Sequence, residues 1–432
     1  MDWKKHICRA GSFYELLDDL PSSPDEVEKF CDQTRKQVEP WLSAVFQAEH
    51  LNLLIGSGFT AAIGAISGAT ATGMSKINIG GTYGKAIDTH AETSARTMGR
   101  GSANIEDQLR SALAVLDGLS VIDKSGYDAL KKKIDEILAE FLKSLLATER
   151  GIHKSSTSKK RDSSNAALQS FLLSFASRAA SRERLHVFTT NYDRLIEHGC
   201  DIAGLRIIDR FVGALNPIFR ASRIEVDMHY NPPGIRGEPR FMEGVIRLTK
   251  LHGSLDWAFD KEDRHISRRG IPFGAVDNHT DIPDNPIDTV MIYPNPAKDV
   301  ETTQYPYAEL FRDFASAVCR PNAVVVTYGY GFGDDHINRV LLDMLTIPST
   351  HLVLISYGAE ERIKAFLDKT RPAQVSLLIG SHFGDLGTLI DNYLPKPALD
   401  YITGRMAELM KSRPIDPSTS SSATSSSGGA MP

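Results

Sequence analysis

Short runs of apolar residues recur along the chain, and each run ends in polar residues or glycine. The runs cover residues 50–55, 185–188, 244–251, 290–292, 323–326, 352–355 and 375–379. A run without polar positions predicts a strand that is buried on both of its faces. Apolar residues at helical spacing separate several of the runs, and strands that alternate with helices form a parallel sheet with helices on both faces. The pattern therefore predicts an α/β fold.

Helical patterns also precede and interrupt the predicted sheet. Residues 1–49 are predicted to form a helical N-terminal extension, because residues 23–26 offer a capping box and apolar residues follow at helical spacing. Pro40 is expected to end or bend that helix. Large apolar residues recur every three or four positions within residues 105–182, which predicts a helical insertion. The sheet domain is then expected to cover residues 50–396.

Three segments show neither the apolar runs of strands nor the apolar spacing of helices. Residues 68–104 are rich in Gly, Thr, Ser and Ala and are predicted to form a long loop that covers a ligand site. Residues 153–165 are polar, with three consecutive basic residues, and are predicted to form a solvated loop; a phosphate or partner patch is the alternative. The C-terminal extension, residues 397–432, ends in Ser, Thr and Gly residues that cannot build a core, so this tail is predicted to be disordered.

Composition narrows the classes of function. The formal net charge is −5, from 49 Lys and Arg against 54 Asp and Glu, which argues against direct binding of nucleic acid. The cysteines form no C-x-x-C pair, so neither a zinc ribbon nor a disulfide framework is expected; they are Cys8, Cys31, Cys200 and Cys319. No signal-peptide pattern opens the chain and no apolar run is long enough for a membrane span. These features predict a cytoplasmic protein without a membrane partner.

The first predicted strand leads into a glycine motif at residues 56–61, Gly-Ser-Gly-Phe-Thr-Ala. This G-x-G-x-x-A pattern lets backbone amides and the N-terminus of the next helix approach a pyrophosphate, as in Rossmann-like sheets. A glycine turn that only packs a helix against a strand is the alternative. A hydride-transferring dehydrogenase is disfavoured, because no acidic residue follows at the distance that such enzymes need, and the next one is Asp88.

Two further strands are predicted to end in residues suited to a nucleotide. Asn191 and Asp193 lie two positions apart after residues 185–188, so an amide and a carboxylate can point the same way. The amide can hold a ribose hydroxyl or a water molecule. His252 follows residues 244–251 and is a candidate base. The alternatives for these residues are an Asx-type helix cap and a structural histidine.

The next strand leads into a glycine-rich loop that ends in two acidic residues: Gly329, Gly331, Gly333, Asp334 and Asp335. Alternating glycines allow the backbone to contact phosphate or ribose, and one aspartate can cap the following helix. A metal-dependent phosphohydrolase that uses the two aspartates and His336 is a less favoured alternative, because no ligand motif such as H-E-x-x-H supports it. A serine hydrolase is weaker still, since Ser57 does not lie in G-x-S-x-G.

The order and spacing of these motifs resemble those of the bacterial sirtuin-like domains of antiphage defence. The matching segments are residues 56–58, 190–193, 251–253, 329–334 and 379–386. The resemblance extends from residue 51 to residue 394. Residues 41–50, which lead straight into the first glycine motif, further resemble the sirtuin-like subunit that works with a HerA-type hexameric ATPase.

The resemblance implies binding of NAD and hydrolysis of its nicotinamide–ribose bond. It assigns catalytic roles to Asn191 and His252. It assigns nucleotide contacts to Gly56, Ser57, Gly58, Phe59, Asp193, Gly329, Gly331 and Asp335. No metal is expected. A homo-oligomer, the HerA-type ATPase as partner, and depletion of NAD during antiphage defence are further implications.

Two other functions remain as alternatives. Protein-deacylating sirtuins carry a four-cysteine zinc ribbon, which has no counterpart in this sequence, so a deacylase is disfavoured. A non-catalytic module that binds NAD or ADP-ribose and regulates a partner ATPase needs the same glycine loops. Only the hydrolase needs Asn191 and His252 to meet at the same sugar.

Overall fold

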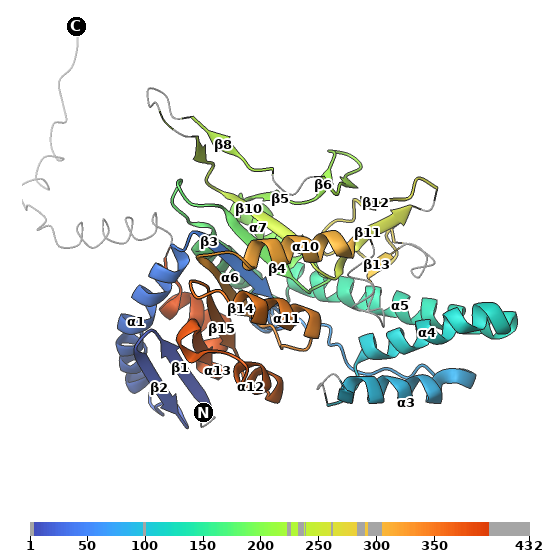
Figure 1. Cartoon of the computed structure of the whole chain (residues 1–432), viewed down its shortest axis with the longest axis horizontal. Helices are drawn as coiled ribbons and strands as arrows, with labels where there is room; N and C mark the ends of the chain where they lie inside the picture. Colours follow the sequence, from blue (N-terminus) through green and yellow to red (C-terminus); the bar gives the residue numbers. More distant parts are fainter. Residues whose placement is uncertain are drawn as a thin grey trace, which may run out of the picture. The chain divides into compact units, whose positions relative to one another are not determined.

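A computed structural model describes residues 4–97, 101–222, 226–231, 237, 239–260, 262–282, 290–292 and 305–396. The predicted C-terminal tail, residues 397–432, lies outside these residues. A central sheet organises the described part of the chain (Figure 1). No helix within the described ranges is long and apolar enough to cross a membrane.

The central sheet has nine strands in the order β2-β1-β16-β15-β14-β3-β4-β10-β5. Their bounds are β1 His6–Ala10, β2 Phe13–Leu17, β3 His50–Ile55, β4 Leu185–Thr189, β5 Arg206–Ile208, β10 Val245–Lys250, β14 Ala323–Tyr328, β15 His351–Ser356 and β16 Val375–Ile379. All neighbours from β16 to β5 are parallel, whereas β1 runs antiparallel to both β16 and β2. The predicted α/β fold with a Rossmann-like parallel sheet is confirmed.

Helices cover both faces of this sheet. The helices of the described residues are α1 Pro24–Phe46, α2 Ser57–Ser67, α3 Gly81–Thr97, α4 Ile105–Ile122, α5 Lys124–His153, α6 Ser158–Ala176, α7 Leu195–Ala203, α10 Tyr307–Val318, α11 Asp335–Met344, α12 Glu361–Leu367, α13 Ser381–Gly384 and α14 Leu386–Thr388. A 3-10 turn at Pro372–Gln374 precedes β16, and a π-helical turn at Leu389–Tyr393 follows α14. Leu53 and Ile55 of β3 pack with α1, α2 and α6, and Leu54 packs with α10, α11 and α12. Alternate residues thus serve opposite faces, which explains the uninterrupted apolar runs.

Two smaller sheets complete the fold. One has five strands, β13 Val290–Ile292, β11 Gly253–Asp260, β12 His265–Arg268, β7 Ile218–Phe219 and β6 Phe211–Val212, and the other pairs β8 His229–Tyr230 with β9 Arg240–Phe241. Residues 290–292, predicted as a strand by their apolar run, therefore belong to the five-stranded sheet.

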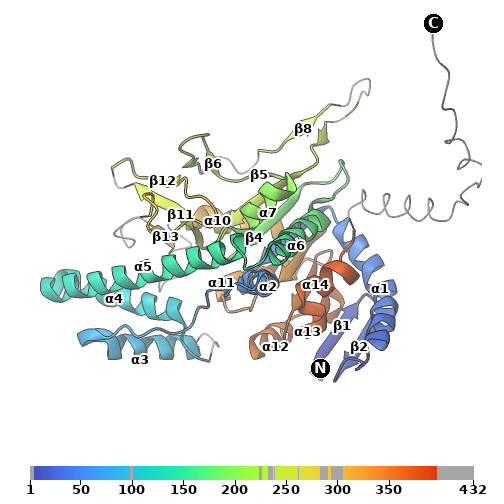
Figure 2. The same ribbon diagram turned by 180° about the vertical axis from the view of Figure 1, so that it is seen from behind.

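The helical insertion differs from its prediction at its start. Helices α3, α4 and α5 lie side by side (Figure 2) and share a cluster that contains Ile87, Leu109 and Ile134. Residues 68–104 were expected to be a loop, but α3 occupies most of their second half. The interior face of α3 is formed largely by Ala91 and Ala95, and alanine gives little hydrophobic contrast to a periodicity search. The insertion therefore has its own core.

The N-terminal segment also departs from the prediction of a wholly helical extension. Residues 6–17 form the hairpin β1–β2, which adds two antiparallel strands to the sheet beside β16. Pro40 neither ends α1 nor marks its boundary, because the helix continues to Phe46. Val38 and Leu42 on either side of the proline are buried in the core, and this packing holds the helix together. Residues 158–165, expected as loop, form the first turns of α6.

Candidate active site

A cavity of about 640 Å³ lies at the carboxyl ends of four neighbouring strands. Gly56 follows β3, Asn191 follows β4, His252 follows β10 and Gly331 follows β14, and all four residues line the cavity. The carboxyl edge of an open parallel sheet is where such folds bind ligands. The strand ends that carried the sequence motifs are therefore brought together.

The insertion and α12 supply the remaining walls of the cavity. Lys76 and Glu92 come from the segment before and within α3, and Glu106 comes from the first turn of α4. Arg362 reaches the cavity from α12. The predicted loop thus contributes Thr72, Met74, Ser75 and Lys76 to the cavity wall, although residues 81–97 of the same segment form α3.

The predicted site residues fall into two groups. Those that line the cavity are Asn191, His252, Gly56, Ser57, Asp193 and Gly331. Those that do not are Gly58, Phe59, Gly329 and Asp335. Phe59 is fully buried and packs against Phe171 and Tyr328 in the core, while Asp335 is exposed in the first turn of α11.

The loops after β3 and β14 pack so closely that three of their positions require glycine. A Cβ atom on Gly56 would lie 2.5 Å from the carbonyl oxygen of Gly329, and one on Gly58 would lie 2.6 Å from the Gly329 Cα. Gly329 itself has a φ of +62°, and a Cβ there would lie 2.6 Å from the amide nitrogen of Phe59. The Gly58 amide donates to the Gly329 carbonyl at 3.0 Å. These glycines hold the two ligand-facing loops together.

Hydrogen bonds fix the side chain of Asn191. Its Nδ2 donates to the Gly56 carbonyl at 3.0 Å and to Thr60 Oγ1 at 3.1 Å. Thr60 in turn donates to Asp193 Oδ2 at 2.7 Å. Because both amide hydrogens have protein acceptors, the oxygen Oδ1 is the atom that can accept a hydrogen bond from a ligand. The network thus gives the Asn191 amide a defined orientation.

Asp193 lines the cavity, and its carboxylate also accepts hydrogen bonds from neighbouring residues at the end of β4. Besides Thr60, its carboxylate accepts the Leu195 amide at 3.1 Å, which caps the start of α7. The buried Lys250 donates to the Asp193 carbonyl and lies 3.0 Å from Glu197 Oε1. Burial raises the pKa of Glu197, and the Lys250 charge opposes that shift. The Asx-type cap considered for this motif is therefore present together with the cavity-lining role of Asn191.

His252 is buried beside the same strand end. Its ring lies 6.3 Å from the ring of Tyr192 and 5.7 Å from that of His336, centroid to centroid. His336 lies 4.6 Å from the Phe311 ring and does not line the cavity. Asn191 and His252 line the same cavity, and the Tyr192 ring is a neighbour of His252.

A comparison with protein families finds a similarity over part of the chain. Residues 185–371 match the SIR2-like domain. The match supports the resemblance to sirtuin-like proteins, and SIR2-like domains indicate NAD-dependent activity. No curated protein matches the chain.

The SIR2-like region supplies only part of the cavity. It contains Asn191, His252 and the glycine loop around Gly331. The loop with Gly56 and the insertion residue Glu106 precede it in the chain. The site is therefore built from the matched region together with residues outside it.

Tyr192 joins the SIR2-like region to the insertion. Its hydroxyl donates to Glu106 Oε1 at 3.1 Å, and its ring packs against Phe141 of α5. Burial and the Glu106 charge raise the pKa of Tyr192 well above its usual value, so the hydroxyl stays protonated and remains a donor. Sequence reasoning missed Thr60, Tyr192 and Glu106. Thr60 and Tyr192 lay inside the recognised motifs, but no local pattern marks Glu106.

A buried ion pair holds the same strand end against α5. Arg194 binds Glu149 with Nη2 to Oε2 at 2.6 Å, and the Arg194 amide donates to Glu149 Oε1 at 2.9 Å. Burial raises the pKa of Glu149, while the Arg194 charge opposes that shift. Both side chains are almost fully buried, so the pair positions the turn that carries Asn191.

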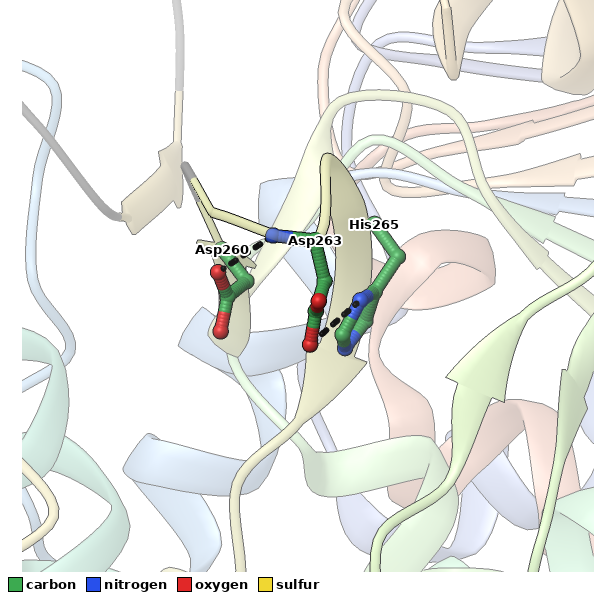
Figure 3. Close-up of side chains that lie close together, drawn as sticks. All are labelled: Asp260, Asp263 and His265. Carbon is green, nitrogen blue, oxygen red and sulfur yellow. Dashed lines mark hydrogen bonds and ion pairs between the residues drawn. The ribbon is translucent and has the colours of Figure 1, made fainter.

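A group of potential metal ligands lies elsewhere, at the β11–β12 hairpin. Asp260, Asp263 and His265 hold ligand atoms within 4.8 Å of one another (Figure 3). Asp260 Oδ1 already accepts the backbone amides of Glu262 and Asp263, which is the pattern of a structural turn. None of the three lines the main cavity.

Proposed function

We propose that this chain is an NAD hydrolase that cleaves the bond between nicotinamide and ribose to give nicotinamide and ADP-ribose. The observation that carries the proposal is that Asn191 and His252 line one cavity at the carboxyl edge of the sheet. The SIR2-like match supports NAD as the ligand. If the two residues faced different cavities, they could not both act on one ribose.

The cavity suits a dinucleotide in size and chemistry. Its volume of about 640 Å³ lies within the range typical of small-molecule and cofactor sites. Ser57 at the start of α2 and the glycine loop at Gly331 are suited to phosphate, because a helix N-terminus and exposed backbone amides favour anions. Arg362 adds a positive charge at that wall of the cavity.

In the proposed reaction, the glycosidic bond breaks and its electron pair leaves with nicotinamide. The oxygen of a water molecule forms the new bond to the ribose carbon, and a proton of that water passes to His252 and then to solvent. Asn191 Oδ1 accepts a hydrogen bond from the water or from a ribose hydroxyl and so orients it. The Thr60–Asp193 chain keeps the Asn191 amide in the orientation that this role requires.

The wider role is also a proposal, supported by the motif resemblance. We infer that the chain acts in the cytoplasm as a homo-oligomer with a HerA-type hexameric ATPase and depletes NAD in antiphage defence. An unchecked NAD hydrolase would exhaust its own cell, so activity is expected to depend on that assembly. The segment of residues 72–76 contributes Thr72, Met74, Ser75 and Lys76 to the cavity wall and is a reasonable place for such control.

The decisive experiment is to incubate the purified protein with NAD, with and without a HerA-type ATPase, and to resolve the products by chromatography. Equal amounts of nicotinamide and ADP-ribose are expected, and EDTA is not expected to reduce them. Binding of NAD with no nicotinamide release in either sample would favour the non-catalytic module. Release of nicotinamide only with an acyl-lysine peptide would favour a deacylase.

A further inference from the structure

The helical insertion places a buried carboxylate in the wall of the cavity. Glu106 lies in the first turn of α4, is 8% exposed and lines the cavity together with Asn191 and His252. Asn104 caps this helix through the Asp107 amide, which fixes where the first turn lies. A helix N-terminus also stabilises negative charge in its first turn.

The other acidic groups of the cavity have different surroundings. Among the described residues, the acidic side chains that line it are Glu92, Glu106, Asp193 and Asp334. Glu92 pairs with Lys76 at 3.0 Å and accepts the Ala103 amide at 3.2 Å. Asp193 is committed to Thr60 and to the Leu195 amide. Asp334 occupies the N-cap position of α11, beside the glycine loop.

Glu106 contacts Tyr192, which lines the same cavity as Asn191 and His252. Its Oε1 accepts the Tyr192 hydroxyl at 3.1 Å, and Tyr192 directly follows Asn191 in the chain. The Tyr192 ring also lies 6.3 Å from the His252 ring. Tyr192 is thus the shared neighbour of Asn191, His252 and Glu106. The nearby Arg110 of α4 contacts Asp107 at 3.4 Å.

We propose that Glu106 is the carboxylate that recognises the positive charge of the nicotinamide end of NAD and stabilises the cationic ribose as the glycosidic bond breaks. This inference rests on the proposed function and extends it to the insertion. As nicotinamide departs neutral with the bonding electron pair, the positive charge moves from its ring to the ribose, and a preorganised carboxylate favours that change. Tyr192 is a positioning residue that holds Glu106 through its hydroxyl.

A binding measurement tests charge recognition without turnover. The probes are carba-NAD, which keeps the cationic ring but resists hydrolysis, and NADH, whose ring is uncharged. Calorimetry of the full-length protein gives the ratio of their dissociation constants. Glu106→Gln is expected to lower the preference for carba-NAD about tenfold, as expected for loss of one charge contact in a partly screened site. Glu140→Gln, at an exposed carboxylate of α5, is the matched control and should keep the wild-type ratio.

A kinetic measurement separates catalysis from binding. For the assembled enzyme, Glu106→Gln is expected to lower kcat about 100-fold, with a much smaller change in KM. Tyr192→Phe keeps the carboxylate but removes its donor, and a loss of about tenfold in kcat is expected. Circular dichroism and thermal unfolding of both variants show whether they fold.

The outcomes distinguish this inference from the proposed function. If the wild-type protein releases no nicotinamide but Glu106→Gln still abolishes the preference for carba-NAD, the hydrolase proposal fails and charge recognition by Glu106 stands. If a folded Glu106→Gln variant keeps the wild-type ratio and the wild-type kcat, the role of Glu106 is overturned while the hydrolase proposal stands. If the wild-type protein binds neither probe and releases no nicotinamide, with the ATPase present in both experiments, both proposals are overturned.

Discussion

The central sheet carries a polar cavity at each of two places, and their chemistry differs. The cavity at the carboxyl edge is lined by glycine loops, Asn191 and His252. A second cavity of about 170 Å³ lies near the amino ends of β3 and β4 and under α10. It is lined by more formal charges, among them Arg210, Arg247 and Asp313.

Most charged side chains that line the second cavity are in ion pairs, either with one another or with a residue outside the cavity. Arg210 binds Asp313 through two contacts of 2.6 Å and 2.8 Å, and Arg247 lies 3.0 Å from Asp227. His186 bonds to Thr249 at 2.9 Å. At the carboxyl edge, by contrast, the fold uses the donors of Asn191 and leaves its oxygen for a ligand. The many charged residues of the second cavity therefore form structural ion pairs, whereas the oriented Asn191 amide indicates a ligand site at the carboxyl edge.

The largest effect on activity is expected from substitutions in the cavity at the carboxyl edge of the sheet. His252→Ala is expected to lower nicotinamide release about 10²- to 10⁴-fold, because general-base catalysis contributes that much, and Asn191→Ala is expected to lower it similarly. The measurement is product formation by the assembled enzyme, with unfolding midpoints to confirm folding. His229→Ala and Asn216→Ala, at exposed positions, are the matched controls. Wild-type turnover in a folded His252→Ala variant would refute its role as base.

In the second cavity, a substitution is expected to lower stability and leave activity unchanged. Asp313→Asn leaves the buried Arg210 without its bidentate partner, and breaking a buried pair costs about 3–5 kcal/mol of unfolding free energy. Urea unfolding measures this loss. At a temperature where the variant stays folded, kcat is expected to be unchanged. A kcat that fell with intact folding would mean that the second cavity also takes part in the reaction.

Substitution of a glycine at the contact between the two loops is expected to lower stability. Gly58→Ala would place a Cβ 2.6 Å from the Gly329 Cα, so the loops must separate at a cost of about 1–3 kcal/mol. Gly118→Ala is a matched control in α4, where a Cβ meets nothing within 4 Å, and it is expected to stabilise by about 0.5–1 kcal/mol. Equal unfolding midpoints for the two variants would contradict the proposed loop packing.

The smallest expected effect concerns pH. Burial, with Arg247 and Arg320 nearby, holds the pKa of His186 well below its usual 6.5. The unfolded chain therefore binds a proton below pH 6.5 that the folded chain does not. As the pH is lowered through this range, the free energy of unfolding decreases by up to about 1.4 kcal/mol per pH unit from this group. His186→Gln is expected to reduce that slope, measured by urea unfolding between about pH 6.5 and 5.

A substitution at an exposed histidine is the control for the pH experiment. His229 lies on the surface of β8, so His229→Gln is expected to retain the wild-type slope. An unchanged slope in His186→Gln would show that His186 does not contribute to acid destabilisation.

Local patterns predicted the sheet well because each inner strand is buried on both faces. Residues 50–55 and 323–326 read as apolar runs for this reason, and the strands β3 and β14 follow them closely. The hairpin β1–β2 was missed because its stability comes from pairing with β16, as in Ile7 opposite Ile379. A contact so distant in sequence leaves no local signal.

In the candidate site too, some features could be predicted from local patterns and others depend on contacts between distant segments. Motif order pointed to Asn191 and His252, and the structure places both in one cavity, although their catalytic roles stay predictions. The glycine motifs had two explanations, and the structure favours close loop packing for Gly58 and Gly329. Glu106 carries no motif, because an acidic residue after a helix cap is common at the start of any surface helix.

By itself, the sequence determined the parallel sheet, its covering helices and the strand ends that carry polar residues, since these follow from local periodicity and short motifs. Only the tertiary structure decided that the insertion completes the cavity, that Tyr192 contacts Glu106, and that Arg210 pairs with Asp313 under α10. Such contacts join segments far apart in the chain, and their geometry depends on how the helices pack rather than on any local pattern.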